Sequence, residues 1–410
     1  MNGNAEIPRV AEPSSRQELC EQVQAAFRAE RPLHVAGLGT KQALGAWPRA
    51  DEGGNALRLT TSGLHRVVAY EPRDLVITVE AGIRWSSLQE LLATHGQWLP
   101  FDPPYPGGTL GGTLATGVTG PRRQRYGTAK DHLLGLHVVS PRGDLTRSGG
   151  RVVKNVTGFD LHRPHVGAFG SLGILVEATF KVSVRPLLSQ ALLVPFASVA
   201  AGHHWLLDVA QSPLQPTALE LLGGALAGEC AQRFGLAWPR AAALALVGVE
   251  GSPPFVRRHL AELQARLPAG AEGLVVEDAR REWEALAQLP ATGGGVTVRL
   301  GTKPSALAAC IPAALASHAS VSVGLGLARL HWPRDAGVEA IGAWVARLDT
   351  MAAVHGGYAC VASAPTDLDG RHALPFYPPR LATTPAHRLF SSLKHAWDPK
   401  HLLNPARAPI

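Results

Sequence analysis

The sequence has few cysteines. Cys20, Cys230, Cys310 and Cys360 are the only four among 410 residues, no two of them form a CxxC pair, and none stands near a histidine at a metal-site spacing. A disulfide framework, a zinc site and an iron–sulfur cluster all need denser or closer cysteines. We therefore expect a reducing cytoplasm as the compartment and no metal site.

Long apolar runs and clusters of basic residues are also absent. The first ten residues lack the apolar core of a signal peptide, and the most apolar window, 308–330, contains Pro312, His318 and Arg329. We therefore expect no membrane span. The net charge is +7, but the arginines are scattered and not interleaved with aromatic residues. This pattern favours binding of small anions over binding of nucleic acid.

The composition is that of a folded, two-domain protein. Hydrophobic residues make up 46% and charged residues 17% of a chain too long for one ordinary core. Helices and strands alternate up to Pro186, where the character changes, and an antiparallel sheet covered by helices is predicted after it. The predicted divisions are residues 1–186, 187–350 and 351–410, an α+β arrangement.

Local signals support this division. Ser15 and Glu18 form a capping box that predicts a helix over 15–30, and a short apolar strand follows at 33–36. Ser87 with Glu90 predicts a second capped helix that ends at Gly96. A run over 321–330 is predicted as one strand.

A short loop follows the first strand and contains Gly37, Leu38, Gly39, Thr40 and Lys41. It lacks the third glycine of GxGxxG, and the chain has no GxxxxGK[ST] segment, so a Rossmann fingerprint and a P-loop are both excluded. Consecutive backbone N–H groups in such a loop form an anion-binding nest, to which Thr40 and Lys41 add a hydroxyl and a charge. A plain turn is the alternative.

The densest glycine stretch lies between Pro106 and Gly173, with fifteen of the 44 glycines. Its first part reads Pro-Gly-Gly-Thr-Leu-Gly-Gly-Thr over 106–113 and continues to Gly120 with further threonines. A flat ring and a pyrophosphate approach a backbone closely only where side chains are small. A glycine-rich hairpin packed on a sheet is the alternative.

Several motifs in order resemble one family. They are Pro106–Arg123 with its GPRR end, Tyr126–Gly127 with Asp131, the KNVTGFD segment over 154–160, and FGSLGI over 169–174. The chain resembles the FAD-binding domain of the vanillyl-alcohol oxidase/p-cresol methylhydroxylase (PCMH-type) superfamily and, within it, the FAD-binding subunits of bacterial glycolate oxidases. The resemblance covers residues 5–186 strongly and 393–407 moderately, and implies an FAD-binding domain of two α/β subdomains.

The resemblance also implies cofactor-binding residues. Gly37 to Lys41 would hold the pyrophosphate, Gly173 and Ile174 would contact the adenine side, and Asn404 would sit near the isoalloxazine. The ribityl chain and flavin would be lined by Pro106, Gly107, Gly108, Thr109, Gly111, Gly112, Thr113, Thr116, Gly117, Thr119 and Gly120. The first loop has neither the histidine to which some relatives attach FAD nor a cysteine, so we expect non-covalent FAD.

Candidate catalytic residues are fewer. A 2-hydroxy acid needs a base for its hydroxyl and a cation for its carboxylate. His355 is the candidate base, and Arg299 or Arg329 the candidate cation; the alternatives are a structural histidine and ordinary ion-pair arginines. Related 2-hydroxyacid dehydrogenases carry metal-binding histidines where this chain has Ser322 and Arg329, which again predicts no metal.

Three functions stay open at this stage. The first is the FAD-binding subunit of a glycolate oxidase-type complex, acting on a small 2-hydroxy acid beside a second flavoprotein subunit and an iron–sulfur subunit, cytoplasmic or held at the inner membrane through these partners. The second is a stand-alone FAD-dependent oxidase of a hydroxy compound. The third is a non-catalytic module with structural FAD or none.

Overall fold

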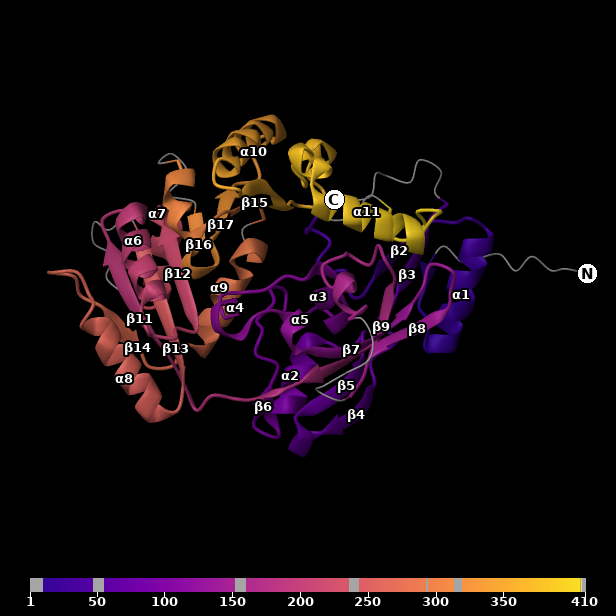
Figure 1. The fold of residues 1–410 in the computed structure, drawn as a ribbon, viewed down its shortest axis with the longest axis horizontal. Coiled ribbons are helices and arrows are strands. Elements are labelled where there is room, and N and C mark those ends of the chain that lie inside the picture. Colours follow the sequence, from indigo (N-terminus) through magenta and orange to yellow (C-terminus); the bar gives the residue numbers. More distant parts are fainter. Residues whose placement is uncertain are drawn as a thin grey trace, which may run out of the picture. The chain divides into compact units, whose positions relative to one another are not determined.

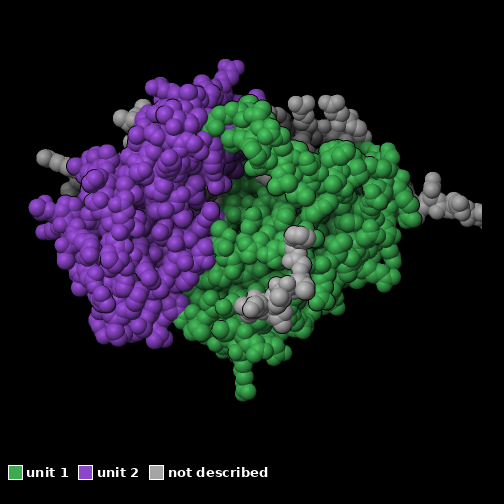
Figure 2. All heavy atoms as spheres, in the orientation of Figure 1, with its two compact units in different colours: residues 1–118, 128–185, 379–410 green, residues 119–127, 186–378 purple. Residues whose placement is uncertain are grey.

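The computed structural model describes residues 10–46, 55–151, 160–235, 243–292, 294–312, 319–405 and 407. The chain forms two compact units, coloured separately in Figure 2. Unit 1 comprises residues 1–118, 128–185 and 379–410, and unit 2 comprises residues 119–127 and 186–378. Most of the KNVTGFD motif lies outside the described residues.

The chain passes between the units close to Pro186, as the change in composition suggests. The C-terminal part divides at a different place from the one we expected. Residues 351–378 stay in unit 2 because β18 (Tyr358–Ser363) pairs with β15 (Val296–Gly301). Only the residues from Pro379 onward belong to unit 1.

Unit 1 contains a small parallel sheet and a larger antiparallel one (Figure 1). The parallel sheet has the order β1-β3-β2, and the antiparallel sheet the order β4-β5-β9-β7-β8. The strands are β1 (Val10–Ala11), β2 (Leu33–Ala36), β3 (Leu57–Thr60), β4 (Val67–Glu71), β5 (Val76–Glu80), β7 (Leu133–Val139), β8 (Leu145–Gly149) and β9 (Ile174–Lys181). A short pair, β6 (Gln97–Trp98) and β10 (Ser183–Val184), lies outside both sheets.

Unit 1 has two apolar cores. Leu19, Val23 and Ala26 of α1 pack with strand residues of both sheets, and Leu88 and Leu92 of α2 pack with the antiparallel sheet. The helices are α1 (Arg16–Arg28), α2 (Trp85–Ala93), α3 (Leu110–Thr116), α5 (Ala129–His132) and α11 (Pro385–Trp397). Both cores therefore include strands of the antiparallel sheet, and the core with α1 joins the two sheets.

The predicted helix starts differ in accuracy. Ser15 caps α1 and accepts the N–H of Glu18 at 3.2 Å, as predicted, although Glu18 accepts from Ser14 rather than from Ser15. The prediction for α2 was wrong by two residues, because the helix begins at Trp85, whose N–H donates to the Gly108 carbonyl, and Arg84 is the N-cap. Gly108, which accepts this hydrogen bond, is distant from Trp85 in the sequence.

Unit 2 is built on one antiparallel sheet of eight strands with the order β14-β11-β13-β12-β16-β17-β15-β18. The strands not yet named are β11 (Leu188–Phe196), β12 (Ala218–Gly223), β13 (Ala243–Gly251), β14 (Leu274–Val276), β16 (Ala319–Ser322) and β17 (Leu327–Trp332). The predicted single strand over 321–330 was wrong, because a turn at Val323–Leu325 with Gly326 at φ 65° makes it a hairpin.

Helices cover the two faces of this sheet unequally. The helices are α4 (Arg123–Tyr126), α6 (Val199–Gln211), α7 (Gly224–Arg233), α8 (Pro253–Gln264), α9 (Arg280–Thr292) and α10 (Val338–Ala353). One face packs against α6, α8 and α10 in a large apolar core, and α7 and α9 pack on the other face over β11, β12 and β13. The predicted helix-covered antiparallel sheet is confirmed.

Candidate functional site

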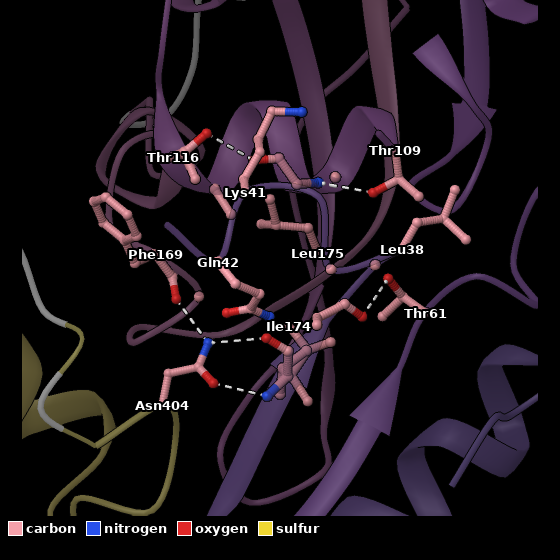
Figure 3. Close-up of a pocket in the computed structure, with 18 of the residues that line it drawn as sticks. Leu38, Lys41, Gln42, Thr61, Thr109, Thr116, Phe169, Ile174, Leu175 and Asn404 are labelled. Atoms are coloured by element: carbon pink, nitrogen blue, oxygen red, sulfur yellow. Dashed lines mark hydrogen bonds between the residues drawn. The ribbon is translucent and has the colours of Figure 1, made fainter. Parts of the chain in front are cut away.

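Unit 1 contains a pocket that gathers segments far apart in the sequence (Figure 3). Its lining residues come from β2 and the loop after it, from β3's end, from α3, from the segment before β9 and from the C-terminal end. They are Val35 to Gln42, Thr61, Thr109, Gly111, Gly112, Ala115, Thr116, Phe169, Gly170, Gly173 to Leu175, Asn404 and Arg407.

The loop Gly37 to Lys41 presents bare backbone to this pocket. Within the described residues, the N–H groups of Leu38, Gly39, Thr40 and Lys41 donate to no protein acceptor. Residues 38–40 are exposed, and Gly39 takes a φ of 71°, which turns the chain. Successive unpaired N–H groups form the nest that an anion such as a diphosphate occupies.

Lys41 is a buried cation at the same place. Its side chain is 5% exposed, its Nζ lies 3.4 Å from the Tyr105 carbonyl oxygen, and it forms no ion pair within the described residues. Burial lowers the pKa of Lys41 to about 8. A buried ammonium without a carboxylate is costly unless an anion from outside the chain neutralises it.

Two glycines allow the close approaches that form the pocket. A Cβ on Gly37 would lie 2.1 Å from Thr109 Oγ1, so the loop contacts the start of α3 through bare backbone. A Cβ on Gly108 would lie 2.5 Å from both Lys41 Nζ and Thr40 Oγ1. A side chain at either position would displace a polar group of the pocket.

The threonines of the second glycine segment have distinct local partners. Thr109 is the N-cap of α3 and accepts the Gly112 N–H at 3.1 Å. Thr113 is fully buried and donates to the Thr109 carbonyl, and Thr116 donates to the Gly112 carbonyl at 2.8 Å. Thr109 and Thr116 line the pocket, whereas Thr113 is not among its lining residues.

The C-terminal segment completes the pocket through Asn404 (Figure 3). Its Oδ1 accepts the Val35 N–H at 2.7 Å, and its Nδ2 donates to the Phe169 carbonyl at 2.7 Å and to the Val35 carbonyl at 3.3 Å. Asn404 therefore joins β2 to the segment around Phe169. Its contact with an isoalloxazine ring stays a prediction.

A buried ion pair holds this segment in place. Lys394 of α11 contacts Asp398 and donates to the carbonyls of Ser171 at 2.8 Å and Leu403 at 3.0 Å. Asp398 in turn accepts the N–H groups of Leu402 and Leu403. Burial lowers the pKa of Lys394, and the Asp398 carboxylate opposes that shift.

Sequence reasoning missed several pocket residues. Arg407 donates to the Leu44 carbonyl at 2.8 Å, bonds to Gln42, and lies over the Phe169 ring at 5.6 Å. No local pattern marks Arg407 or Gln42. Phe169 lies in a quoted motif, and its φ of 53° is a property that the sequence does not display for a phenylalanine.

Some predicted cofactor residues lie elsewhere than in the pocket lining. Pro106, Gly107, Gly108, Thr113 and Gly117 belong to unit 1 but are not among the lining residues, and Gly117 ends α3 with a φ of 63°. Thr119 and Gly120 belong to unit 2. Their contact with a cofactor stays a prediction.

Unit 2 carries a second candidate site on its sheet. On β12, β16, β17, β15 and β18, many of the residues that alternate with the apolar ones of the large core are polar, although Ala218, Leu222 and Leu327 share these positions. We call this set the polar face; it consists of Glu220, Thr297, Arg299, Ser320, Ser322, Arg329, His331 and Tyr358. Glu220, Thr297, Ser320 and Ser322 are buried and the other four are half-buried. Buried polar groups are costly unless they are hydrogen-bonded.

Arg299 and Arg329, the two predicted carboxylate-binding residues, are direct neighbours on the polar face. They pair across β15 and β17, where opposed side chains start about 5 Å apart. Arg329 Nη2 lies 3.4 Å from the Thr119 carbonyl oxygen, and the Arg299 guanidinium lies 5.5 Å from the Tyr358 ring centre. Like charges directly opposite are destabilising, so an anion between them would stabilise the pair.

The GPRR motif has a structural contact in unit 2. Arg122 is buried and bonds to Glu250 at 3.1 Å, and the Tyr126 hydroxyl donates to the same carboxylate at 3.1 Å. Burial, with the Glu250 charge, raises the pKa of Tyr126. Arg122 therefore attaches residues 119–127 to β13.

His355, the predicted base, lies in the turn after α10 and before β18. It is half-buried, and its side chain forms no hydrogen bond or ion pair within the described residues. It is three residues before Tyr358, but no interaction joins it to Arg299 or Arg329. The structure therefore brings the two arginines together and leaves the histidine separate.

The described residues contain no cluster of three or more His, Cys, Asp or Glu side chains able to hold a metal. In the same residues, every helix is too short or too polar to cross a lipid bilayer.

Comparison with known families identifies the N-terminal part. Residues 7–149 match the family described as FAD binding domain. This segment contains the Gly37–Lys41 loop and α3, and the pocket they line fits a dinucleotide cofactor by its nest, its buried lysine and its bare glycines.

Two glycolate oxidase subunits are among the curated relatives. The chain is 39% identical to glycolate oxidase subunit GlcE of Escherichia coli (strain K12) over 179 residues, which is 43% of this chain and 49% of that protein. It is 29% identical to glycolate oxidase subunit GlcD of Bacillus subtilis (strain 168) over 279 residues, or 67% of this chain and 58% of that protein.

A third relative is mitochondrial D-lactate dehydrogenase [cytochrome] 1 of Saccharomyces cerevisiae, 34% identical over 159 residues, or 39% of this chain and 27% of that protein. The chain thus spans between about a quarter and three fifths of the length of these relatives. It is related to FAD-linked oxidoreductases that include glycolate oxidase subunits and D-lactate dehydrogenases.

The fold has solved counterparts. Two structures of alkyldihydroxyacetonephosphate synthase match with TM-scores of 0.68 and 0.70 at 18% and 19% identity, covering 97% of this chain and 76% of theirs. At this identity the match shows the fold alone, and it confirms the predicted PCMH-type architecture with a second domain built on a large antiparallel sheet.

Proposed function

We propose that this chain binds FAD non-covalently in the unit 1 pocket and oxidises a small 2-hydroxy acid as the FAD-binding subunit of a glycolate oxidase-type complex. The observation that carries the cofactor assignment is Lys41, a buried cation without a carboxylate partner among the described residues, beside four unpaired backbone N–H groups. Electrons would pass to a second flavoprotein subunit and an iron–sulfur subunit.

Each group of residues has a proposed part in this reaction. Lys41, Thr40 and the loop N–H groups bind the diphosphate, and bound FAD supplies the hydride acceptor. Arg299 and Arg329 bind the substrate carboxylate, since paired guanidiniums suit a planar anion. His355 is kept as the proposed base for the hydroxyl proton.

The relatives support the substrate class by their names, glycolate oxidase subunits and D-lactate dehydrogenases. The likeness to GlcE, a glycolate oxidase subunit, supports a role as one subunit of a complex. A location in the cytoplasm, or at a membrane through partners, is part of the proposal. Glycolate and D-lactate are therefore the substrates to assay first.

The cofactor is tested on the purified full chain. We expect flavin absorbance near one equivalent per chain, and acid precipitation should release FAD into the supernatant, because the first loop offers no histidine or cysteine for attachment. A colourless protein that takes up no FAD contradicts the proposal, and flavin that stays with the precipitate contradicts non-covalent binding.

The activity is tested with glycolate, D-lactate and a dye acceptor, with and without a second flavoprotein subunit and an iron–sulfur subunit of the glycolate oxidase type. We expect turnover only in the reconstituted complex, and Arg299→Lys should raise KM for the acid without loss of FAD. Rapid oxygen consumption by the chain alone supports instead a stand-alone oxidase, and flavin without turnover in any combination supports a non-catalytic module.

A further inference from the structure

The polar face of unit 2 contains a buried carboxyl group that the proposed reaction leaves unused. Glu220 lies on β12, a central strand of the sheet, and is 4% exposed. On the same face its strand neighbours Ala218 and Leu222 pack in an apolar core with α7 and α9. Glu220 is the only charged side chain on β12. It lies at the border between this apolar core and the polar face.

One oxygen of this carboxyl group is without a partner. Glu220 Oε1 is inaccessible to solvent and accepts no hydrogen bond within the described residues, while the Ser322 hydroxyl on the paired strand β16 bonds to the carboxyl group. An unsatisfied buried acceptor costs about 1–3 kcal/mol, and more when it is charged. Burial without a partner for this oxygen therefore favours the neutral form of the carboxyl group over its ionised form.

The Arg329 charge acts on Glu220. The Arg329 guanidinium favours the ionised carboxyl, but the two side chains form no ion pair within 4.0 Å in the described structure. Arg299 lies directly opposite Arg329 on the next strand. Glu220 therefore shares the polar face with two guanidiniums but forms no ion pair with either of them within the described residues.

We propose that Glu220 is a proton-linked partner of the Arg299–Arg329 pair, so that binding of a small carboxylate to the pair is coupled to uptake of one proton by Glu220. The inference rests on the proposed function, because it takes the arginine pair as the carboxylate site. Glu220 acts through Arg329 and is a positioning residue.

The coupling follows from charge. A carboxylate held by the arginines repels an ionised Glu220 and therefore favours its protonated form, and protonation of Glu220 in turn raises the affinity for the carboxylate by the same factor. Burial already raises the pKa of Glu220 to about 7 in the free protein, with Arg329 and Ser322 opposing the shift. The proton is therefore exchanged near neutral pH.

Other ionisable groups on the elements around β12 are accounted for. Glu250 of β13 is neutralised by Arg122 and hydrogen-bonded by Tyr126, and His331 of β17 lies between the hydroxyls of Ser320 and Thr297. Further ionisable side chains on the neighbouring elements are Arg123 and Arg125 of α4, His203, His204 and Asp208 of α6, Glu229, Cys230 and Arg233 of α7, Arg280, Arg281 and Glu284 of α9, and Arg299 of β15. Among the described residues, Arg329 is the side-chain charge that acts on Glu220.

The test is titration of the FAD-loaded full chain with oxalate, a dead-end dicarboxylate, by calorimetry in two buffers of different ionisation enthalpy. We expect uptake of up to one proton per oxalate between pH 7 and 8.5, and Kd should rise by up to about 10-fold per pH unit over this range. Glu220→Gln should take up no proton and bind oxalate with a Kd that changes less than about twofold.

Two further variants make the result specific. Ser322→Ala removes a bond that favours the ionised carboxyl, so proton uptake should persist to higher pH. Glu229→Gln, an exposed acid of α7, should leave proton uptake unchanged. Ser322→Ala and Glu229→Gln test the role of Glu220 even if Glu220→Gln folds poorly.

The outcomes separate this inference from the proposed function. One outcome overturns the inference and leaves the carboxylate site standing. In it, Arg329→Gln weakens oxalate binding, but binding takes up no proton and Glu220→Gln has no effect. No oxalate binding by the unaltered, FAD-loaded chain overturns both.

Discussion

At the scale of single residues, the two candidate sites are defined by buried charges that the described protein groups do not neutralise. Lys41 in unit 1 and Glu220 in unit 2 are each more than nine-tenths buried without a direct ion pair among the described residues. Each such charge reduces the stability of the free protein. Both therefore predict a stability that depends on pH, with opposite signs.

Removal of the Lys41 charge should weaken FAD binding and stabilise the free protein. Lys41→Met is expected to raise Kd for FAD by about 10- to 100-fold, because a charge-assisted hydrogen bond contributes about 1.5–3 kcal/mol. A lysine whose folded pKa of about 8 lies below its ordinary 10.5 holds fewer protons in the folded state. Stability of the FAD-free protein should therefore rise between pH 8 and 10.5, and Lys41→Met should abolish this rise.

Equilibrium urea unfolding across this pH range and flavin fluorescence titration measure the two effects. Lys181→Met, at an exposed end of β9, is the matched control and should change neither. Equal FAD affinity of Lys41→Met and the unaltered protein is the result that would contradict a role at the diphosphate.

Glu220 should give the opposite dependence. Its folded pKa of about 7 lies above the ordinary 4.5, so the folded state holds more protons and stability falls as pH rises from 4.5 to 7. The loss is at most about 3 kcal/mol, and Glu220→Gln should not show it. Urea unfolding at pH 5 and pH 7.5 measures the difference, and an equal change in both proteins would argue against a raised pKa.

At the scale of elements, the unit 1 pocket depends on close approach of a loop, a helix start and a returning C-terminal segment. Gly37 contacts Thr109 at the start of α3, and Asn404 joins β2 to the segment around Phe169. None of these contacts is local in sequence. Changes that separate the elements should therefore reduce FAD binding without removing any group that touches FAD.

Gly37→Ala tests the approach of the loop to α3. The added Cβ would lie 2.1 Å from Thr109 Oγ1, so the loop must move, and we expect FAD occupancy after purification to fall to less than about a tenth. Gly342→Ala in α10, where nothing lies within 4 Å, is the control and should stabilise unit 2 by about 0.5–1 kcal/mol. Full occupancy in Gly37→Ala would refute the close approach.

Lys394→Met tests the C-terminal segment. Loss of one partner leaves Asp398 charged and buried, so we expect a loss of about 3–5 kcal/mol in stability and faster proteolysis after α11. Lys400→Met, which breaks an exposed pair with Glu30, should cost less than about 1 kcal/mol. Similar proteolysis of the two variants would show that the buried pair does not hold the segment.

At the scale of the whole molecule, the chain separates two kinds of site between two units. The dinucleotide-type pocket belongs to unit 1, and the polar face belongs to unit 2, each with its own apolar cores. Ligands of different chemistry should therefore stabilise different parts of the chain.

Hydrogen exchange of the full chain tests this separation. FAD should slow exchange of the pocket segments of unit 1, 35–42, 109–116 and 169–175. Oxalate added afterwards should slow exchange in β12, β15 and β17 of unit 2. Oxalate protection confined to unit 1 would contradict the assignment of the carboxylate site.

The sequence by itself determined the local features whose causes are local. The capped helix after Ser15, the glycine loop of Gly37 to Lys41, the α+β class and the absence of a Rossmann fingerprint all follow from residue types at short spacing. The motifs between Pro106 and Ile174 indicated an FAD-binding domain, and residues 7–149 match that family.

Only the tertiary structure decided which distant residues meet. The return of the C-terminal segment brings Arg407 to Gln42 and Asn404 to Val35. Strand register brings Arg299 opposite Arg329. The start of α2 depends on the Gly108 carbonyl, and the burial of Glu220 depends on two helices packed over β12. Burial and long-range pairing are properties of the packed chain, and no spacing within the sequence specifies them.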